Sequence, residues 1–284
     1  MMGGRLWKIG GAIFDLSQQG LIMGILNVTP DSFSDGAKFF TAEKAVEHGL
    51  GMAEEGAQII DVGGESTRPG SEPVGAEEEI RRVIHVIEKL RAQIDILISI
   101  DTSKAEVANV AIQAGASIVN DVTGGRGDKE MMSLVAKTKS AFIIMHMQGN
   151  PRTMQVEPRY VDVVSEVADF FRQQYACALD YGIDPMAIAF DPGIGFGKTL
   201  EHNLELLAQL ERLRVHDRPL VTGVSRKSFL AKLTDSSDMS GRLASTVALT
   251  SLLRARGGDV FRVHDIKENV SALRVTEAIL QQAK

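Results

Sequence analysis

The chain has 284 residues, of which 44% are hydrophobic and 24% charged, so it can bury a large core and lacks the composition of a disordered protein. Its formal net charge of −6 argues against a general nucleic-acid binder, which would carry a basic face. The single cysteine, Cys177, excludes an internal disulfide and any metal site built from several cysteines.

The sequence also lacks signals for export or membrane insertion. Its N-terminus does not show the succession of basic, long apolar and small-residue segments of a signal peptide. No apolar run approaches the ~18 residues of a membrane-spanning helix. We therefore expect a cytoplasmic protein with neither a membrane nor a nucleic-acid partner.

The first predicted element is a β-hairpin over residues 5–15, where Gly10 and Gly11 separate two short alternating segments. Eight short apolar runs follow, separated by stretches with helical periodicity. Each run carries or leads to a polar residue, and these residues are Asn27, Asp61, Glu65, Asp101, Asn120, His146, Asp191, Ser225, Lys227, Arg262 and His264. The helices are predicted over 42–56, 76–94, 103–114, 128–139, 160–181, 200–213, 239–256 and 265–282.

This alternation predicts an α/β fold, a (β/α)8 TIM barrel whose bottom is capped by the hairpin. Because such a barrel needs ~250 residues, we expect residues 1–284 to form a single domain. Threonine or serine at 41, 102–103 and 199 predicts three helix N-caps. The long connections 28–40, 64–75 and 147–159 are expected to bind or cover a substrate.

The glycine-rich segment from Asp191 to Thr199 matches two phosphate-binding motifs incompletely. A Walker loop needs glycine at the position of Pro192, and the dinucleotide motif needs glycine where Lys198 stands. What remains is a carboxylate at a strand end, followed by glycines that let the backbone approach a flat ligand closely. The alternative is a glycine-rich turn in which Asp191 caps a helix.

Asp101, Asn120 and Asp191 end predicted strands, so their side chains can point into one barrel mouth. Two carboxylates and an amide suit a heterocycle with amino and ring N–H donors, such as the edge of a pterin or a purine. The alternative is that each residue merely caps the helix that follows it, which would have to hold for all three at once.

The loops after the seventh and eighth strands form the usual anion-binding corner of such barrels. Arg262 can hold phosphate oxygens bidentately, and Lys227 can act as a point charge or a donor, unless it is a solvated surface lysine. Asn27 can place an amide oxygen on Mg²⁺, which needs few protein ligands, unless it only forms a turn. Arg68 can meet a small carboxylate, whereas His146 lacks companion metal ligands, so we expect it in a ligand wall or as a polar core residue.

Six motifs together carry a specific resemblance to a known family. They are GILNVTPDSFSDG at 24–36, DVGGESTRPG at 61–70, HMQG at 146–149, DPGIGFGK at 191–198, SRKSF at 225–229 and RVH at 262–264. In this order, from about residue 20 to residue 282, they resemble the dihydropteroate synthases, folate-pathway enzymes among the pterin-binding barrels. The resemblance implies a transferase that joins 6-hydroxymethyl-7,8-dihydropterin diphosphate to p-aminobenzoate and releases pyrophosphate and 7,8-dihydropteroate.

The resemblance also implies roles for individual residues. The pterin would be held by Asp101, Asn120, Asp191 and Lys227, with walls from Val122, Met145, Phe196 and Gly223. Mg²⁺ would bind Asn27, and pyrophosphate would bind Arg262 and His264. The p-aminobenzoate site, where sulfonamides compete, would comprise Thr67, Arg68, Pro69 and Ser228, and Phe33 and Asp35 would close over the reacting centre.

The implied chemistry explains these residue types. Loss of pyrophosphate develops negative charge that Mg²⁺, Arg262 and His264 can stabilise, and positive charge on the pterin that Asp35, Asp101 and Asp191 can balance. Together with Lys227, these aspartates and Arg262 form the expected catalytic set. The family also implies a homodimer whose contact involves the late helices.

Three other functions remain open. A methyltetrahydrofolate-dependent methyltransferase is disfavoured, because methyl transfer needs neither a pyrophosphate clamp nor an aminobenzoate loop. A non-catalytic pterin-binding paralogue would be expected to lose residues such as Asn27, Arg68 or Lys227, which are present. A Schiff-base aldolase using Lys227 is the third, and borohydride trapping would detect it.

Overall fold

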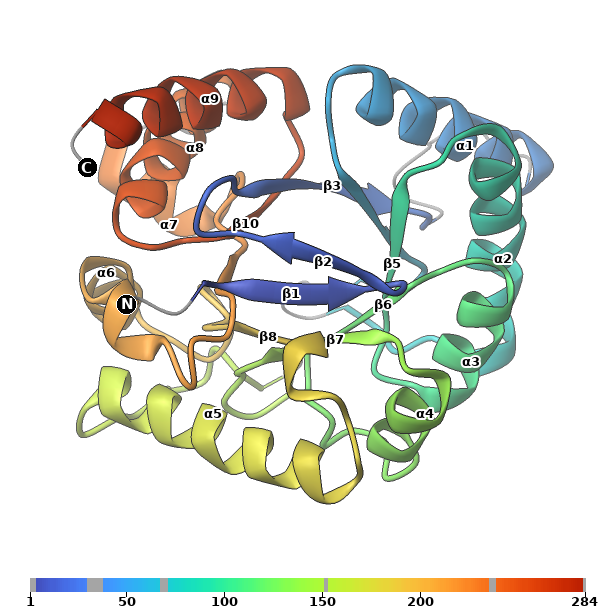
Figure 1. Ribbon diagram of the computed structural model, residues 1–284, viewed down its shortest axis with the longest axis horizontal. Coiled ribbons are helices and arrows are strands. Elements are labelled where there is room, and N and C mark those ends of the chain that lie inside the picture. The colour runs from blue at the N-terminus through green and yellow to red at the C-terminus, as the bar shows by residue number, and fades with distance from the viewer. Residues whose placement is uncertain (1–3, 30–37, 67–70, 151–152, 235–238, 283–284) are drawn as a thin grey trace.

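The computed structural model describes residues 4–29, 38–66, 71–150, 153–234 and 239–282, without the side chains of 38–41 and 239–241. Within these residues, parallel strands surround a central axis and helices form an outer layer (Figure 1). The strands are β3 (Leu21–Asn27), β4 (Ile59–Gly63), β5 (Leu97–Asp101), β6 (Ile118–Asp121), β7 (Ala141–Met145), β8 (Ile188–Asp191), β9 (Val221–Thr222) and β10 (Val260–Val263).

The sheet closes into a barrel. Its hydrogen-bonded order is β8-β7-β6-β5-β4-β3-β10-β9. The remaining seam, between β8 and β9, is closed by a bridge between Phe190 and Leu220, beside which the Phe190 amide donates to the Pro219 carbonyl at 2.9 Å. The predicted (β/α)8 barrel is therefore confirmed.

The helices follow the predicted ranges closely, with one addition. They are α1 (Lys38–Glu54), α2 (Ala76–Gln93), α3 (Ala105–Gln113), α4 (Met131–Thr138), α5 (Val163–Asp180), α6 (Leu200–Ala208), α7 (Ser228–Thr234), α8 (Met239–Ala255) and α9 (Ile266–Gln282), with 3-10 turns at Pro185–Ala187 and Leu210–Leu213. Helix α7 was not predicted, because seven residues make too few turns to show a helical period.

One of the three predicted N-caps is confirmed. The Thr199 hydroxyl accepts from the His202 amide at 3.2 Å, and the His202 imidazole accepts from the Thr199 amide in return. The other two are wrong. Helix α1 begins before Thr41, and the cap position of α3 is the extended residue Lys104 and not the pair 102–103.

The predicted hairpin consists of β1 (Leu6–Ile9) and β2 (Ala12–Asp15). Gly10 and Gly11 join the strands with φ values of +56° and +88°, which suit a two-residue hairpin turn. The hairpin lies across one end of the barrel (Figure 1), and Trp7 enters it completely buried, donating to the Ala187 carbonyl at 3.0 Å. This confirms the predicted cap at the barrel bottom.

The barrel interior is apolar at the hairpin end. Trp7, Ile9 and Leu16 pack there against strand residues, which include Leu21, Met23, Ile59, Ile118, Ala141, Ile143, Ala189, Val221 and Val260. These residues lie near the amino ends of their strands, so the polar residues gather at the opposite end. Among the described residues, no helix is both long and apolar enough to cross a membrane.

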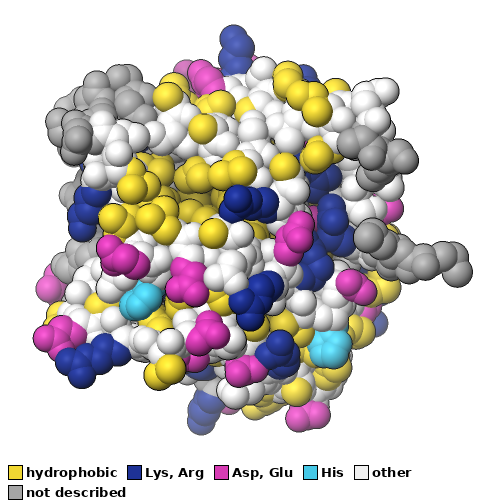
Figure 2. Space-filling view, turned by 90° about the vertical axis from the view of Figure 1, so that its left-hand side faces the viewer, with side chains coloured by type: hydrophobic (Ala, Val, Ile, Leu, Met, Phe, Trp, Pro, Cys, Tyr) yellow, Lys and Arg dark blue, Asp and Glu magenta, His cyan; other side chains and the backbone are white. Residues whose placement is uncertain are grey.

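Helices α8 and α9 present an unusually apolar outer surface. On α8 the exposed positions 244, 248, 252 and 255 are alanine or leucine, and on α9 Val275 and Ile279 are 59% and 65% exposed. Figure 2 views the side of the molecule that carries these helices and shows hydrophobic side chains gathered into one broad area. Such an area on an exposed surface is typical of a protein interface.

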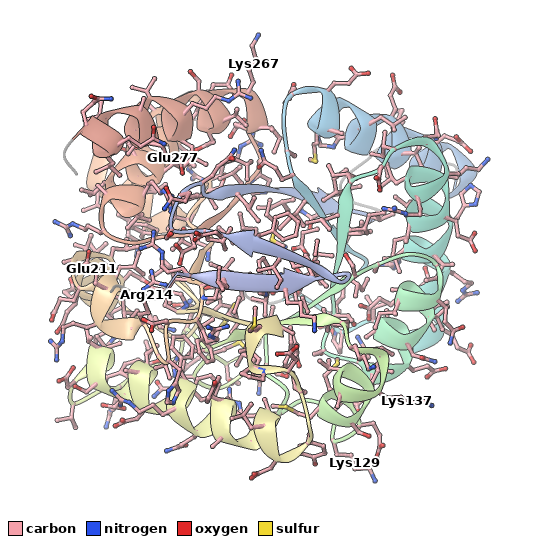
Figure 3. The ribbon with its side chains drawn as sticks, in the orientation of Figure 1. Lys129, Lys137, Glu211, Arg214, Lys267 and Glu277 are labelled. Carbon is pink, nitrogen blue, oxygen red and sulfur yellow. The ribbon has the colours of Figure 1, made fainter. Side chains whose placement is uncertain are left out.

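A buried ionic cluster fastens the barrel bottom. Asp259 is fully buried between Arg5 at 2.7 Å and Arg214 at 2.9 Å, and Arg254 lies 3.6 Å away. Arg254 also pairs with Glu277 at 2.8 Å, which links the last helix to the strand ends (Figure 3, where Arg214 and Glu277 are labelled). The cluster therefore ties together the hairpin, the last strand and the last helix.

We expect Asp259→Asn to lower the free energy of unfolding by about 3–5 kcal/mol, because the change removes a fully buried charge that pairs with the partly buried Arg5 and Arg214 and lies near the buried Arg254. The matched control is Lys8→Met, which breaks the half-exposed Lys8–Asp184 pair and should cost less than about 1 kcal/mol. Urea unfolding of both variants measures the difference. Similar losses in the two variants would contradict a special role for the cluster.

Candidate active site

Strand register brings the predicted polar residues to one level at the carboxyl end of the barrel. Asn27, Gly63, Asp101 and Asn120 are consecutive neighbours across β3, β4, β5 and β6. A Cβ atom on Gly63 would lie 3.5 Å from the Asp101 Cβ and 3.8 Å from the Asn27 Oδ1. Because glycine leaves this space open, the side chains of Asn27 and Asp101 flank a common opening.

Arg262 connects this level to the barrel interior. Its Nε donates to Asp61 and its Nη2 to Asp101, each at 2.6 Å. The Asn120 amide donates to the same Asp61 oxygen at 3.1 Å. Asp61 was noted in the sequence without a role, because no motif showed that it would meet a residue 201 positions away. These two contacts use Nε and one N–H of Nη2 and do not involve Nη1, so the binding of phosphate oxygens by Arg262 stays a prediction.

The buried carboxyl of Asp101 is electrostatically unusual. Burial raises the pKa of Asp101 to about 7, with Arg262 opposing the rise and Asp61 adding to it. Burial acts to lower the pKa of Arg262, but the carboxylates of Asp61 and Asp101 outweigh it and raise that pKa. The guanidinium therefore stays charged, while Asp101 changes charge near neutral pH.

Asp191 and Lys227 form a second charged group across the mouth. A Cβ atom on Gly223 would lie 3.9 Å from both the Asp191 Oδ2 and the Lys227 Nζ, so the two charges face the space in front of this glycine. Burial lowers the pKa of Lys227 to about 8, with Asp191 opposing the shift. Burial likewise raises the pKa of Asp191 against the charge of Lys227.

An apolar wall lies beside these charges. The predicted wall residues Val122, Met145 and Phe196 do pack together, joined by Met147 and Met154. The Lys227 Nζ lies 4.7 Å above the Phe196 ring, within the range of a cation–π contact. The two additional methionines belong to the loop after β7, which was predicted to bind or cover a substrate, and Met147 also lies in the HMQG motif at 146–149.

The corner after β9 and β10 holds the predicted anion-binding residues. The Ser225 hydroxyl and the His264 Nδ1 are 3.0 Å apart, and Arg226 pairs with Asp265 through two nitrogens. These contacts join the two loops, so that His264 lies beside the segment that carries Lys227. Ser228 begins α7 in the same segment.

Several predicted site residues lie outside the described part of the chain. They are Phe33, Asp35, Thr67, Arg68 and Pro69. Within the described part, no cluster of three or more His, Cys, Asp or Glu side chains could hold a metal ion. The donor available at the mouth is the amide oxygen of Asn27, a hard ligand of the kind that Mg²⁺ accepts.

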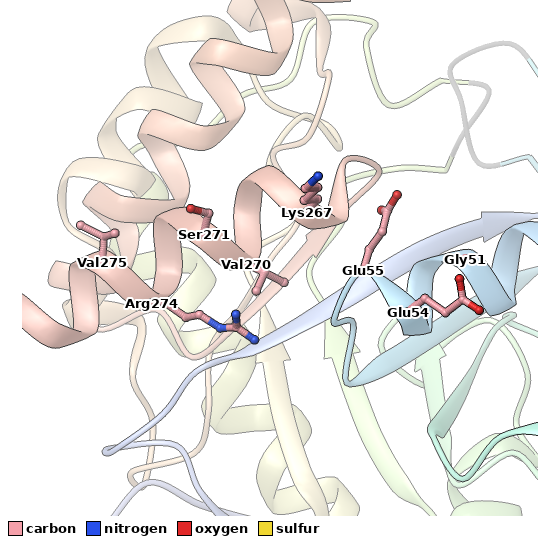
Figure 4. Close-up of a pocket in the computed structure, with 8 residues that line it drawn as sticks. All are labelled: Gly51, Glu54, Glu55, Lys267, Val270, Ser271, Arg274 and Val275. Atoms are coloured by element: carbon pink, nitrogen blue, oxygen red, sulfur yellow. The ribbon is translucent and has the colours of Figure 1, made fainter.

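A separate groove of about 750 Å³ lies on the outer helical layer, between α1 and α9 (Figure 4). Its lining residues are Gly51, Glu54, Glu55, Lys267, Val270, Ser271, Arg274 and Val275. None of the predicted site residues lines it. The chemistry predicted from the sequence therefore belongs to the barrel mouth and not to this groove.

Comparisons with known proteins agree with this geometry. A sequence model of the family described as "Pterin binding enzyme" matches residues 23–264. The dihydropteroate synthase of Synechocystis sp. is 45% identical over 271 residues, which cover 95% of this chain and 94% of that protein.

Solved structures show the same likeness. The dihydropteroate synthase of Xanthomonas albilineans with 4-aminobenzoic acid superimposes with a TM-score of 0.91 at 43% identity, covering 98% of this chain and 99% of that one. The same enzyme with 7,8-dihydropteroate superimposes with a TM-score of 0.86 at 41% identity, and the match covers 97% of this chain and 98% of that one. The Yersinia pestis enzyme with a sulfonamide drug superimposes with a TM-score of 0.90 at 39% identity, and the match covers 97% of this chain and 99% of that one.

Identity at this level along nearly the entire chain, together with the charged barrel mouth, shows that the chain belongs to the dihydropteroate synthase family of pterin-binding enzymes.

Proposed function

We propose that this protein joins 6-hydroxymethyl-7,8-dihydropterin diphosphate to p-aminobenzoate, releasing pyrophosphate and 7,8-dihydropteroate. The observation that carries the proposal is the buried mouth in which Asp101, Asn120, Asp191 and Lys227 face one opening beside an apolar wall. Relatives whose structures contain 4-aminobenzoic acid, 7,8-dihydropteroate or a sulfonamide drug support the same substrates and the same class of inhibitor here.

The pterin fits the mouth by charge and by shape. Its amino group and ring N–H groups are donors, and Asp101, Asp191 and the Asn120 amide oxygen are acceptors. Its flat ring would pack against the apolar wall that includes Met145 and Phe196, and Lys227 would donate to the ring acceptors. Desolvation strengthens each of these contacts, which explains why the acceptors are buried carboxylates and not exposed ones.

The diphosphate would lie toward the corner that holds Arg262 and His264. Arg262 keeps its positive charge there, because Asp61 and Asp101 stabilise the guanidinium. Asn27 would hold Mg²⁺, which when bound neutralises the charge of the leaving diphosphate. One amide ligand fits this role, since Mg²⁺ completes its shell with water and phosphate oxygens.

The chain's residues can assist both halves of the substitution. As the bond between the pterin methylene and the diphosphate oxygen breaks, the electron pair leaves with the diphosphate, and Arg262 and His264 stabilise it. The positive charge left on the pterin is balanced by Asp101 and Asp191. The amine nitrogen then forms the new bond to the methylene and loses a proton. Arylamines are already nucleophilic, so alignment supplies much of the rate.

A homodimer through the apolar face of α8 and α9 completes the proposal. The stripe at positions 244, 248, 252 and 255 recurs at helical spacing and faces outward, with Val275 and Ile279 beside it on α9. A self-complementary patch of this kind is suited to a two-fold interface.

The assay that tests the proposal mixes the protein with Mg²⁺, p-aminobenzoate and the dihydropterin diphosphate, and measures pyrophosphate and dihydropteroate together. We expect equal formation of both, dependent on the amine and slowed by a sulfonamide. Lys227→Ala should lower turnover at least about 100-fold while the fold survives, because it removes a half-buried donor and its charge. Lys129→Ala, at an exposed position, should retain wild-type turnover.

Tight pterin binding without product would identify a non-catalytic pterin-binding paralogue. A Lys227→Ala variant with wild-type turnover would refute the role assigned to this lysine.

The affinity for the pterin should depend on pH with a maximum between about 7 and 8. The ionised carboxylate of Asp101 is a stronger acceptor than the protonated acid, so affinity should fall as pH decreases below the Asp101 pKa of about 7. Lys227 loses its charge as pH rises through about 8, so affinity should fall again. Calorimetric titration with 6-hydroxymethyl-7,8-dihydropterin, repeated from acid to alkaline pH, measures the affinity on both sides of this maximum.

Lys227→Arg provides the control, because a guanidinium stays charged throughout this range. In this variant the fall in pterin affinity at alkaline pH should disappear, and the fall at acid pH should remain. An unchanged fall at alkaline pH would assign that transition to a group other than Lys227.

We expect Leu252→Glu to produce monomers at concentrations where the wild-type protein is dimeric, because it buries an unpaired charge in the proposed interface. Sedimentation velocity measures the change. Leu179→Glu changes a leucine of similar exposure on α5, 39% against 45% for Leu252, and should leave the dimer intact. A monomeric wild-type protein would overturn the proposed interface.

A further inference from the structure

Every carbonyl from 193 to 197, in the loop after β8, accepts a hydrogen bond from a side chain. The Gln155 amide donates to Gly195 at 2.7 Å, and the Tyr160 hydroxyl donates to Gly197 at 2.8 Å. Lys227 donates to the carbonyl of residue 194. The carbonyls of residues 193 and 196 are both held by Lys198, each at 3.0 Å. Loops seldom have all their carbonyls fixed by side chains, so this segment is held in a defined shape.

Lys198 lies at the centre of this arrangement and is only 2% exposed. Besides the two loop carbonyls, its Nζ meets the His146 Nδ1 at 3.0 Å and the His146 carbonyl at 3.4 Å. Burial, together with the charge of Lys198, lowers the pKa of His146 to about 2, so the ring is neutral and its Nδ1 accepts. Burial lowers the pKa of Lys198 itself to about 7, and its four acceptors favour the ammonium form.

The glycines of the loop bring it directly against the loop after β7. Gly193 and Gly197 have φ values of +62° and +61°, and a Cβ atom on either would overlap a carbonyl oxygen, that of His146 or that of Gln148. The two loops therefore touch through their backbones, and Lys198 supplies the hydrogen bonds inside the contact.

The loop carries a face of the site. Phe196 belongs to the apolar wall, and the residue 194 carbonyl anchors Lys227, whose Nζ lies over the Phe196 ring. A shift of this loop would change both the position of the Phe196 ring beside Met145 and the direction of the lysine donor. The Lys198 Nζ lies within hydrogen-bonding distance of four protein acceptors in the loops and has three N–H groups to share among them, so its effect on a ligand is transmitted through these neighbours.

We propose that Lys198 is a positioning residue which, with Tyr160 as a second anchor, sets the Phe196 ring and the Lys227 Nζ for the pterin. The inference rests on the proposed function, because it concerns the pterin half of that site. It predicts a selective effect on pterin affinity, since the anchored loop forms the pterin wall.

The test compares Lys198→Met, Tyr160→Phe and the exposed control Lys129→Met. For each variant, calorimetry gives the Kd for the dihydropterin, steady-state kinetics at saturating pterin gives the KM for p-aminobenzoate, and a thermal melt reports folding. Lys198→Met should raise the pterin Kd at least about tenfold and change the amine KM less than about twofold, because only the pterin wall is released. Tyr160→Phe should raise the pterin Kd by about two- to fivefold with little change in Tm. Lys129→Met should match the wild-type protein.

A folded Lys198→Met variant with wild-type pterin affinity would overturn the inference. Equal rises in the pterin Kd and the amine KM would also overturn it, because they would indicate a merely structural role. If Lys198→Met does not fold, Tyr160→Phe decides, and wild-type affinity in that variant refutes the positioning role. A wild-type protein that binds no pterin would refute the proposed function itself, whereas loss confined to the variants would not.

Discussion

The contact of Arg262 with Asp61 and Asp101 is the interaction on which the arrangement of the barrel mouth depends. It joins β10, β4 and β5 inside a closed barrel, where an unpaired charge would be very costly. One carboxylate, Asp61, is completely buried and also receives the Asn120 amide. The positive charge of Arg262 and the acceptor oxygens of Asp61 and Asp101 are therefore held by one network, and the position of each depends on the other.

The two ends of the barrel solve opposite physical problems. At the hairpin end, Trp7 and Ile9 complete an apolar interior, and the ionic cluster around Asp259 fastens the hairpin to the last strand and helix. At the other end, the same strands finish on polar residues whose burial shifts their pKa values toward neutrality, as for Asp101 and Lys227. Stability and chemistry are thus separated along the barrel axis, as is typical of this fold.

Rigidity at the mouth comes from side chains that hold backbone. The glycines after β8 allow the loop to lie against its neighbour, but glycine alone would leave the loop free to move. Lys198, Gln155 and Tyr160 remove that freedom by occupying its carbonyls. A flat ligand can then meet a preformed wall, which reduces the entropy lost on binding.

The sequence by itself determined the alternation of strands and helices, the hairpin and the residue types at the strand ends, because hydrophobic periodicity and turn residues are local signals. It missed α7, which is too short to show a period, and it misplaced two caps, because helix ends are set by neighbouring turns as much as by the capping residue. Only the tertiary structure decided that Arg262 pairs with Asp61, that Lys198 is a buried anchor, and that Phe196 joins Val122 and Met145 in one wall. These contacts join residues far apart in the chain, and their partners are set by barrel closure and strand register, which no local pattern of residues encodes.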